Sequence, residues 1–176
     1  MKKNEVIAEI LDWAKYLAGA VVLALILNNT VVISAQVMSP SMESTMMTGS
    51  KILGNRLAYL FSNPKRNDII VFKFPDNESA DPYLKRIIGL PGETVDIKDG
   101  KVYINGSSAA LDEGFINETM YGDYGPFVVP ENSYFVMGDN RNNSEDSRFW
   151  NNKFVAKDKI IGKVLVEWFP SPHLLK

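Results

Sequence analysis

The feature that most constrains this chain is an unbroken apolar run close to its N-terminus. Residues 16–27 read YLAGAVVLALIL and contain no charged side chain. An α-helix needs about 20 apolar residues to cross the hydrocarbon core of a bilayer. The run reaches that length when it is extended back to Ile10, provided that Lys15 snorkels and Asp12 lies near the headgroups. The segment therefore predicts a single long apolar helix.

Spacing alone leaves three interpretations of this helix open. It has the apolar length of a secretory signal peptide, and residues 33–35 (ISA) offer a small-residue cleavage site. A single membrane anchor and a buried core helix have a similar composition. Lysines at positions 2, 3 and 15 precede the run, whereas the next Lys or Arg is Lys51. In a membrane, this asymmetry predicts a cytoplasmic N-terminus and translocation of the remaining chain.

Composition excludes several kinds of site. The 176 residues carry 19 Lys+Arg and 21 Asp+Glu, a net charge of −2, which argues against nucleic-acid binding through phosphate contacts. Without cysteine there is no disulfide, thiolate zinc site or cysteine nucleophile. The single histidine, His173, rules out a multi-histidine metal site and would force a Ser-His-Asp triad through the C-terminal tail. We expect chemistry without imidazole, sulfur, metal or cofactor.

After residue 30 the chain changes to short β-type segments. Candidate strands are residues 31–38, 52–53, 68–74, 83–90, 94–97, 102–104, 133–137 and 160–168. Asp99-Gly100 has the residue types of a tight hairpin turn, and residues 57–61 have the pattern of one helical turn. Residues 105–130, rich in Gly, Asn and Asp, predict a loop or small insertion. We therefore expect a mostly β fold: an N-terminal helix within residues 1–30, then a domain of short antiparallel strands over 31–176, forming a partly open barrel or sandwich.

The first segment with chemical potential is Ser39-Pro40-Ser41-Met42, at the end of a candidate strand. Proline restricts the backbone before Ser41, so this hydroxyl can be presented in a fixed direction. The alternative is an ordinary turn serine. Neither a G-x-S-x-G elbow nor an S-x-x-K motif surrounds Ser41, because Ser44 stands where that lysine would be.

The second segment is residues 83–88 (YLKRII). Side chains alternate along a strand, so Lys85 shares a face with Tyr83 and Ile87, while Arg86 points to the opposite face. An aromatic and an aliphatic neighbour favour desolvation of the Lys85 ammonium, whereas the alternative is a solvated strand lysine.

The third segment is residues 138–148 (GDNRNNSEDSR), directly after a candidate strand. It does not match an EF-hand calcium loop, because Arg141 occupies the third position and Ser144 replaces the turn glycine. A plain polar loop is the alternative. The density of Asp, Asn, Ser and Arg before Phe149-Trp150 favours a hydrogen-bonded platform.

Taken in order behind one apolar segment, S-P-S-M, Y-L-K-R-I-I-G-L-P-G-E and G-D-N-R-N-N-S-E-D-S-R resemble the type I signal peptidases of bacteria. These are membrane-anchored serine proteases that use a Ser-Lys dyad. The resemblance extends from the apolar segment to Trp168, and the short gaps and single apolar helix are similar to the compact form of Gram-positive bacteria.

The resemblance implies a role for each matching residue. Ser41 matches the nucleophile, Lys85 the general base, and Ser39 a hydroxyl that forms the oxyanion hole with the Ser41 N–H. Ser144 matches the serine that orients the lysine, and Asp146 with Arg148 match a supporting ion pair. Val37, Met42 and Leu84 fall where the family lines its substrate pockets.

Four positions depart from the family pattern. Ser44 stands where the family usually has proline, Asn142 where it has aspartate, Asn67 where it has glycine, and Asn151 where glycine follows the third segment. None of these departures removes an atom from the implied dyad. Asparagine tolerates positive φ, so Asn67 can substitute for glycine in a turn.

The implied chemistry sets a physical condition on Lys85. A lysine with the usual pKa of about 10.4 is neutral only about four times in ten thousand at pH 7, so its pKa must fall by roughly three units. Burial away from carboxylates lowers a lysine pKa in this way. A neutral amine then accepts the Ser41 proton, and an acyl-enzyme follows.

The resemblance also implies partners and location. The expected substrates are signal-peptide-bearing preproteins of Sec-type export, at a bacterial cell membrane that the chain spans once, with residues 31–176 as an extracytoplasmic catalytic domain and the protein acting as a monomer. Two alternatives have other functions. A self-cleaving Ser-Lys repressor would need a DNA-binding helical module, which does not precede Ser41. A non-enzymatic anchored β-domain would serve as a scaffold.

Overall fold

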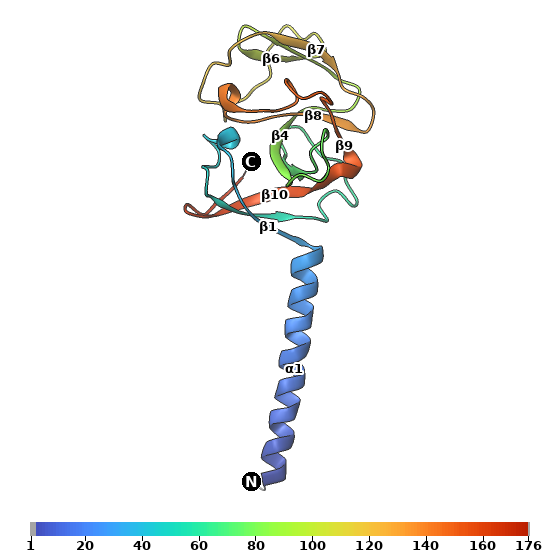
Figure 1. Cartoon of the computed structure of the whole chain (residues 1–176), viewed down its shortest axis with the longest axis vertical. Helices are drawn as coiled ribbons and strands as arrows, with labels where there is room; N and C mark the ends of the chain where they lie inside the picture. The colour runs from blue at the N-terminus through green and yellow to red at the C-terminus, as the bar shows by residue number, and fades with distance from the viewer. Residues whose placement is uncertain (1–2, 176) are drawn as a thin grey trace.

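One long helix projects from a β-rich body in the computed structural model, which describes residues 3–175 (Figure 1). Helix α1 (Lys3–Thr30) contains a 22-residue segment, Glu9–Thr30, with a mean hydropathy of 1.9 and none of its residues buried. This segment is about 33 Å long at 1.5 Å per residue, which matches a bilayer core. A buried core helix is therefore excluded as its interpretation. Residues 1, 2 and 176, including Lys2 of the predicted cytoplasmic end, lie outside the described residues.

The predicted mostly β fold is confirmed. The larger sheet has the order β1-β2-β10-β3-β4-β8-β9, with every neighbouring pair antiparallel and β11 paired to β10. Its strands are β1 (Val32–Gln36), β2 (Lys51–Asn55), β3 (Ile69–Phe72), β4 (Tyr83–Gly89), β8 (Ser133–Met137), β9 (Val155–Ala156), β10 (Ile160–Phe169) and β11 (His173–Leu174). The β-branched and aromatic residues of these segments favour strands because they pack well on a pleated, half-buried surface.

The larger sheet curls so that strands far apart in its order border one cavity. Residues of β1 and of β4 both line this cavity, although β2, β10 and β3 separate the two strands in the sheet. The apolar cluster inside the curl consists of Ile33, Val37, Met42, Met46, Ile52, Ile69, Val71 and Val164. The curl follows from the right-handed twist of strands, and residues of all three polar segments line the cavity that it borders.

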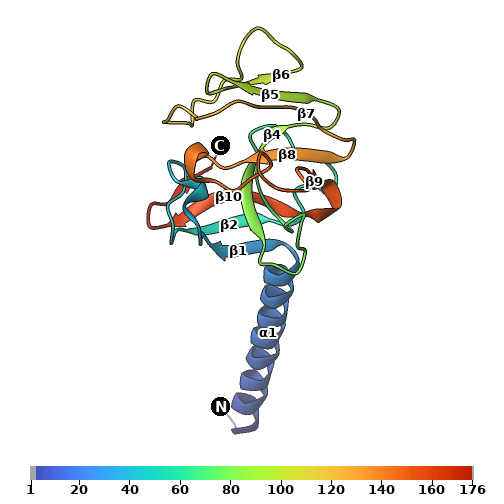
Figure 2. The same cartoon turned by 45° about the horizontal axis from the view of Figure 1, so that its top comes forward.

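A smaller sheet packs against β4 and β8 of the larger sheet (Figure 2). It has the order β6-β5-β7, with β5 (Thr94–Lys98), β6 (Lys101–Ile104) and β7 (Tyr124–Val128). The predicted hairpin joins β5 to β6, with φ of 49° at Asp99 and 72° at Gly100. Strand β7 lies inside residues 105–130, which we expected to be a loop or insertion. Its Gly125 and Pro126 hide the strand pattern, and proline is tolerated there because β7 is an edge strand.

Several short elements could not be predicted from the sequence. The 3₁₀ turns η1 (Pro40–Met42), η2 (Arg141–Asn143) and η3 (Lys157–Lys159) are too short to show a helical period. The expected helical turn at residues 57–61 is instead a hydrogen-bonded turn, in which the Leu60 N–H donates to the Leu57 carbonyl.

A buried ion pair fastens β4 to the segment that follows β8. Arg86 Nε and Nη2 donate to the two carboxylate oxygens of Asp139 at 2.9 and 2.7 Å, and both side chains are fully buried. Arg86 Nη1 also donates to the Asn67 carbonyl at 2.9 Å. Asn67 has φ of 70°, as its place in a glycine-type turn predicted. Arg86 therefore links three segments: its own strand β4, the turn at Asn67 and the polar segment that contains Asp139.

Replacing Arg86 by methionine is expected to lower the free energy of unfolding by about 3–5 kcal/mol, because Asp139 is left buried without its bidentate partner. Urea unfolding of the full chain in detergent, followed by circular dichroism, measures this change. The matched control is Lys159→Met, since Lys159 forms its ion pair with Glu78 at the protein surface, where such pairs contribute little to stability. Equal losses from the two variants would contradict the structural role given to Arg86.

Candidate active site

The predicted nucleophile lies in a short turn that its neighbours hold in place. Ser39 is extended, with φ of −132° and ψ of 155°, and Pro40 begins η1, so Ser41 is presented by a 3₁₀ turn at the end of β1. Asn140 secures this turn from the third polar segment: its N–H donates to the Ser41 carbonyl at 3.1 Å and its Nδ2 to the Pro40 carbonyl at 3.0 Å. Ser41 is 6% exposed. The turn is thus fixed by backbone contacts that leave the hydroxyl free to face the cavity.

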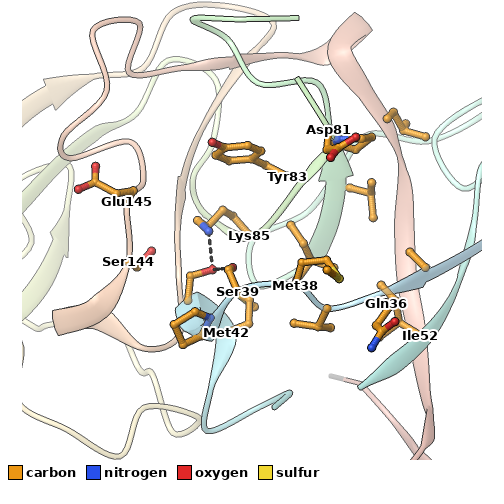
Figure 3. A pocket seen from close by; sticks show the side chains of 18 of the residues that line it. Gln36, Met38, Ser39, Met42, Ile52, Asp81, Tyr83, Lys85, Ser144 and Glu145 are labelled. Atoms are coloured by element: carbon orange, nitrogen blue, oxygen red, sulfur yellow. Dashed lines mark hydrogen bonds between the residues drawn. The ribbon is translucent and has the colours of Figure 1, made fainter. Parts of the chain in front are cut away.

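Lys85 and Ser41 both line the cavity and are hydrogen-bonded to each other. Lys85 Nζ lies 2.6 Å from Ser41 Oγ, and the lysine is only 4% exposed (Figure 3). The alternation of β4 puts Tyr83 on the same side, with its ring centroid 5.8 Å from Nζ. The solvated-lysine alternative is therefore excluded by the burial of this side chain.

Burial lowers the pKa of Lys85 from 10.5 to about 8, because desolvation penalises the ammonium form. The charges of Asp146 and Asp139 act in the opposite direction, and that of Arg148 lowers the pKa further. Each carboxylate is already bound by an arginine, Asp146 by Arg148 and Asp139 by Arg86. Glu145 also raises the pKa, so desolvation outweighs three acidic neighbours.

The hydroxyl of Ser39 lies next to that of Ser41, with 3.1 Å between the two Oγ atoms. Both serines line the cavity, so the predicted oxyanion-hole hydroxyl and the predicted nucleophile face the same space.

Asp146 is the hub of the third segment and is fully buried. Arg148 donates to it from Nε and Nη2, both at 2.8 Å, and the Gly138 N–H donates at 3.0 Å. The Ser144 hydroxyl also donates to Asp146, at 2.7 Å. Within residues 3–175, the hydrogen-bond partner of Ser144 Oγ is thus Asp146, and that of Lys85 Nζ is Ser41. The predicted contact between Ser144 and Lys85 is not formed in this state, although both residues line the cavity.

Gly138 makes the close packing of this segment possible. A Cβ atom at this position would collide with Ser144 Oγ and with the Ser41 carbonyl. The absence of a side chain therefore lets the third segment approach the nucleophile turn.

The cavity has a volume of about 860 Å³ and extends from the dyad along β1 and β4. Val37, Met42 and Leu84, the predicted pocket residues, all line it, and Ile33, Ile52 and Ile161 extend its apolar wall. Glu145 lies beyond Ser144, on the other side of the dyad from Met38 and Gln36 (Figure 3). His173 lies in β11 and is not among the lining residues. Among the described residues, no group of three or more His, Asp or Glu side chains could hold a metal ion.

Two residues of the site were not assigned a role from the sequence. Asp139 and Asn140 belonged to the predicted platform, but their partners, Arg86 and the Pro40–Ser41 backbone, are distant in the chain. Arg86, a charged residue within an apolar strand pattern, was the available indication of a buried ion pair.

Comparisons with known proteins agree over most of the chain. The family described as "Signal peptidase, peptidase S26" matches residues 10–169. A probable signal peptidase I-2 of Synechocystis sp. is 38% identical over 168 residues, covering 93% of this chain and 75% of that protein. A signal peptidase I of Bacillus amyloliquefaciens is 38% identical over 178 residues, covering 95% of this chain and 92% of that protein.

A solved structure supports the same relationship. The crystal structure of a signal peptidase I from Enterococcus faecalis V583 is 38% identical, with a TM-score of 0.50, and the match covers 58% of this chain and 97% of that one. The apolar helix α1 also fits a membrane-anchored protein of this kind. On the extent of the family match and of these identities, the chain belongs to the signal peptidase family, peptidase S26, and is a serine peptidase.

Proposed function

We propose that this protein cleaves signal peptides from exported preproteins with Ser41 as nucleophile and Lys85 as general base. Membership of the family supports the removal of signal peptides. The observation that carries the finer mechanism is the 2.6 Å separation of Lys85 Nζ and Ser41 Oγ in a buried site. A neutral amine at this distance is within reach of the hydroxyl proton.

The reaction proceeds in two halves. Ser41 Oγ attacks the scissile carbonyl carbon while its proton passes to Lys85 Nζ, and the Ser39 hydroxyl with the Ser41 N–H stabilises the oxyanion. The C–N bond then breaks as the Lys85 ammonium donates its proton to the leaving amine, and an ester to Ser41 remains. Lys85 next takes a proton from water, whose oxygen attacks the ester carbonyl. The bond between Ser41 Oγ and the acyl carbon then breaks as the Lys85 ammonium returns its proton to Oγ. The signal peptide leaves as a carboxylic acid, which loses its own proton to solvent.

The pKa of Lys85 near 8 makes about one molecule in ten competent at pH 7. This fraction exceeds that of a solvated lysine by more than two orders of magnitude. A bound substrate removes further water from the cavity and so favours the neutral amine more strongly. Ser144 is assigned the orienting role in this loaded state, and the Asp146–Arg148 pair supports it.

The shape of the cavity suits an extended peptide with small side chains before the cut. A substrate strand can add alongside β1 or β4 by main-chain hydrogen bonds. Val37, Met42 and Leu84 then form shallow apolar pockets that accept alanine and exclude larger side chains by steric clash.

Helix α1 fits the role of a single membrane anchor, with the N-terminus cytoplasmic and the β-domain outside. The bilayer is then a partner, and it concentrates emerging preproteins near the site. We assign the working unit as a monomer, because the proposed dyad and pocket come from one chain.

Ser41→Ala and Lys85→Ala are each expected to lower cleavage of a synthetic signal-peptide segment by at least about a thousandfold, because each removes one half of the dyad. Lys85→Arg is expected to be equally inactive, since a guanidinium stays charged at every working pH. The assay uses the full chain in detergent, with unchanged circular dichroism as the folding control. Lys101→Ala, at an exposed lysine of β6, is the matched variant. Substantial turnover by Ser41→Ala or Lys85→Arg would refute the dyad.

The value of kcat/KM is expected to rise with pH through a midpoint near 8, the pKa of Lys85. The sign follows from the base being active when deprotonated, so activity increases about tenfold per pH unit below the midpoint and levels off above it. Initial rates on a fluorogenic signal-peptide segment between pH 6 and pH 10 measure this profile. A flat profile, or a midpoint above about 10, would contradict the assignment of Lys85 as the base.

A further inference from the structure

Residues 113–121, which we call the strap, lie between β6 and β7 in the chain and contact the third polar segment, residues 138–148. They lie within the 105–130 region and contain neither helix nor strand. Their side chains and backbone nevertheless contact η2 and its neighbours at several points. The strap therefore gives the 105–130 region a structural connection to the active site.

The first contact is a bidentate ion pair. Arg141 Nη1 and Nη2 donate to the two carboxylate oxygens of Glu113 at 3.1 and 2.5 Å, and Arg141 is only 2% exposed. Arg141 Nε also donates to the Gly138 carbonyl at 3.0 Å. In addition, the Phe115 ring lies 3.9 Å from the Arg86 guanidinium carbon. The N-terminal end of the strap is thus attached to the third polar segment at Arg141.

The second contact involves the whole side chain of Asn142. Its backbone N–H and its Nδ2 donate to the two oxygens of Glu118 at 3.1 and 2.7 Å. Nδ2 also donates to the Thr119 carbonyl at 2.9 Å, and Oδ1 accepts the Tyr121 N–H at 2.9 Å. An amide provides both the donor and the acceptor that this arrangement requires. Asn142 and Glu118 are therefore chemically matched.

The contacts of the strap continue to the reacting groups. Asn142, Asn143 and Ser144 form one wall of the substrate cavity. The residue just before η2, Asn140, holds the Pro40 and Ser41 carbonyls. A displacement of η2 therefore moves both the cavity wall and the nucleophile turn.

An aspartate at position 142 would disturb this arrangement in this chain. Its carboxylate would have no donor for the Glu118 oxygen or the Thr119 carbonyl, and it would place a second negative charge against Glu118. We propose that Asn142 and Glu118 are paired positioning residues, through which the strap holds η2 and the nucleophile turn in their active arrangement. The inference rests on the proposed signal-peptide cleavage.

The test is a double-mutant cycle in the full chain in detergent, assayed on a synthetic signal-peptide segment. Asn142→Asp is expected to lower kcat/KM by about tenfold, mainly through kcat. Glu118→Gln alone is expected to lower it by about threefold, because the amide keeps only one of the two acceptor oxygens that Asn142 uses and turns a donor toward the other contact. The double variant is expected to be about as active as Glu118→Gln, because the amide introduced at position 118 can donate to the carboxylate introduced at position 142.

Asn143→Asp is the matched charge control. It adds the same charge in the same cavity wall, but no hydrogen bond joins the Asn143 side chain to Glu118 within the described residues. Adding Glu118→Gln to the Asn143→Asp variant is expected not to raise its kcat/KM. Adding the same substitution to Asn142→Asp is expected to raise kcat/KM. Thermal unfolding of each variant separates loss of positioning from loss of the fold, because Asn142 and Glu118 are exposed.

Rescue of Asn142→Asp by Glu118→Gln, with little change in the unfolding temperature, supports the proposal. Independent effects of the two substitutions, or equal rescue of Asn143→Asp, would overturn it. If the unsubstituted protein does not cleave the segment, the proposed function itself fails. If that protein cleaves and Asn142→Asp cleaves equally well, the function stands and the positioning role is wrong.

Discussion

A lysine amine held out of water beside a serine hydroxyl is the interaction on which the rest of this structure depends. Lys85 is 4% exposed and its Nζ lies 2.6 Å from Ser41 Oγ. Burying an ammonium is costly unless its charge is matched or lost. The fold supplies no salt bridge to this amine within residues 3–175, so burial lowers its pKa to about 8. A pKa near 8 leaves about one amine in ten neutral at pH 7, as the proposed role of Lys85 as general base requires.

The surroundings of the amine show how such a site tolerates nearby acids. Asp139 and Asp146 are both fully buried close to Lys85, and the negative charge of each raises the pKa of this lysine, although less than burial lowers it. Bidentate hydrogen bonds from Arg86 and Arg148 occupy these carboxylates. The same pairs fasten the segment after β8 to β4 and organise its turn. Two ion pairs thus provide rigidity without an acidic partner for Lys85, and the strap extends this support through Glu113 and Glu118.

Much of the fold could be predicted from local patterns, whereas the contacts between loops could not. The strands around residues 69–72 and 83–89 and the Asp99-Gly100 hairpin follow from β-branched runs and turn residues. Strand β7 was hidden because Gly125 and Pro126 are unfavourable in strands, and its place depends on pairing with β5. In the site, Ser41 and Lys85 were identified by resemblance, and alternation along β4 explained the face that Lys85 shares with Tyr83. The partners of Asn140, Asn142 and Arg86 lie far away in the chain, so no local pattern indicates them. Ser144 donates to Asp146, a fully buried carboxylate that is stabilised by the hydrogen bonds it accepts, and this contact could not be predicted from the sequence.

The most direct test of the central claim is a titration of Lys85 itself by nuclear magnetic resonance. Lysine labelled with ¹³C at Cε is introduced into the full chain in detergent micelles, and the Lys85 resonance is assigned by its absence from the Lys85→Arg spectrum. The account predicts a chemical-shift midpoint near pH 8 for the Lys85 resonance, more than two units below the ordinary lysine value of about 10.4. A Lys85 midpoint at or above about 10 would show that the amine is charged at neutral pH and would contradict its role as the base.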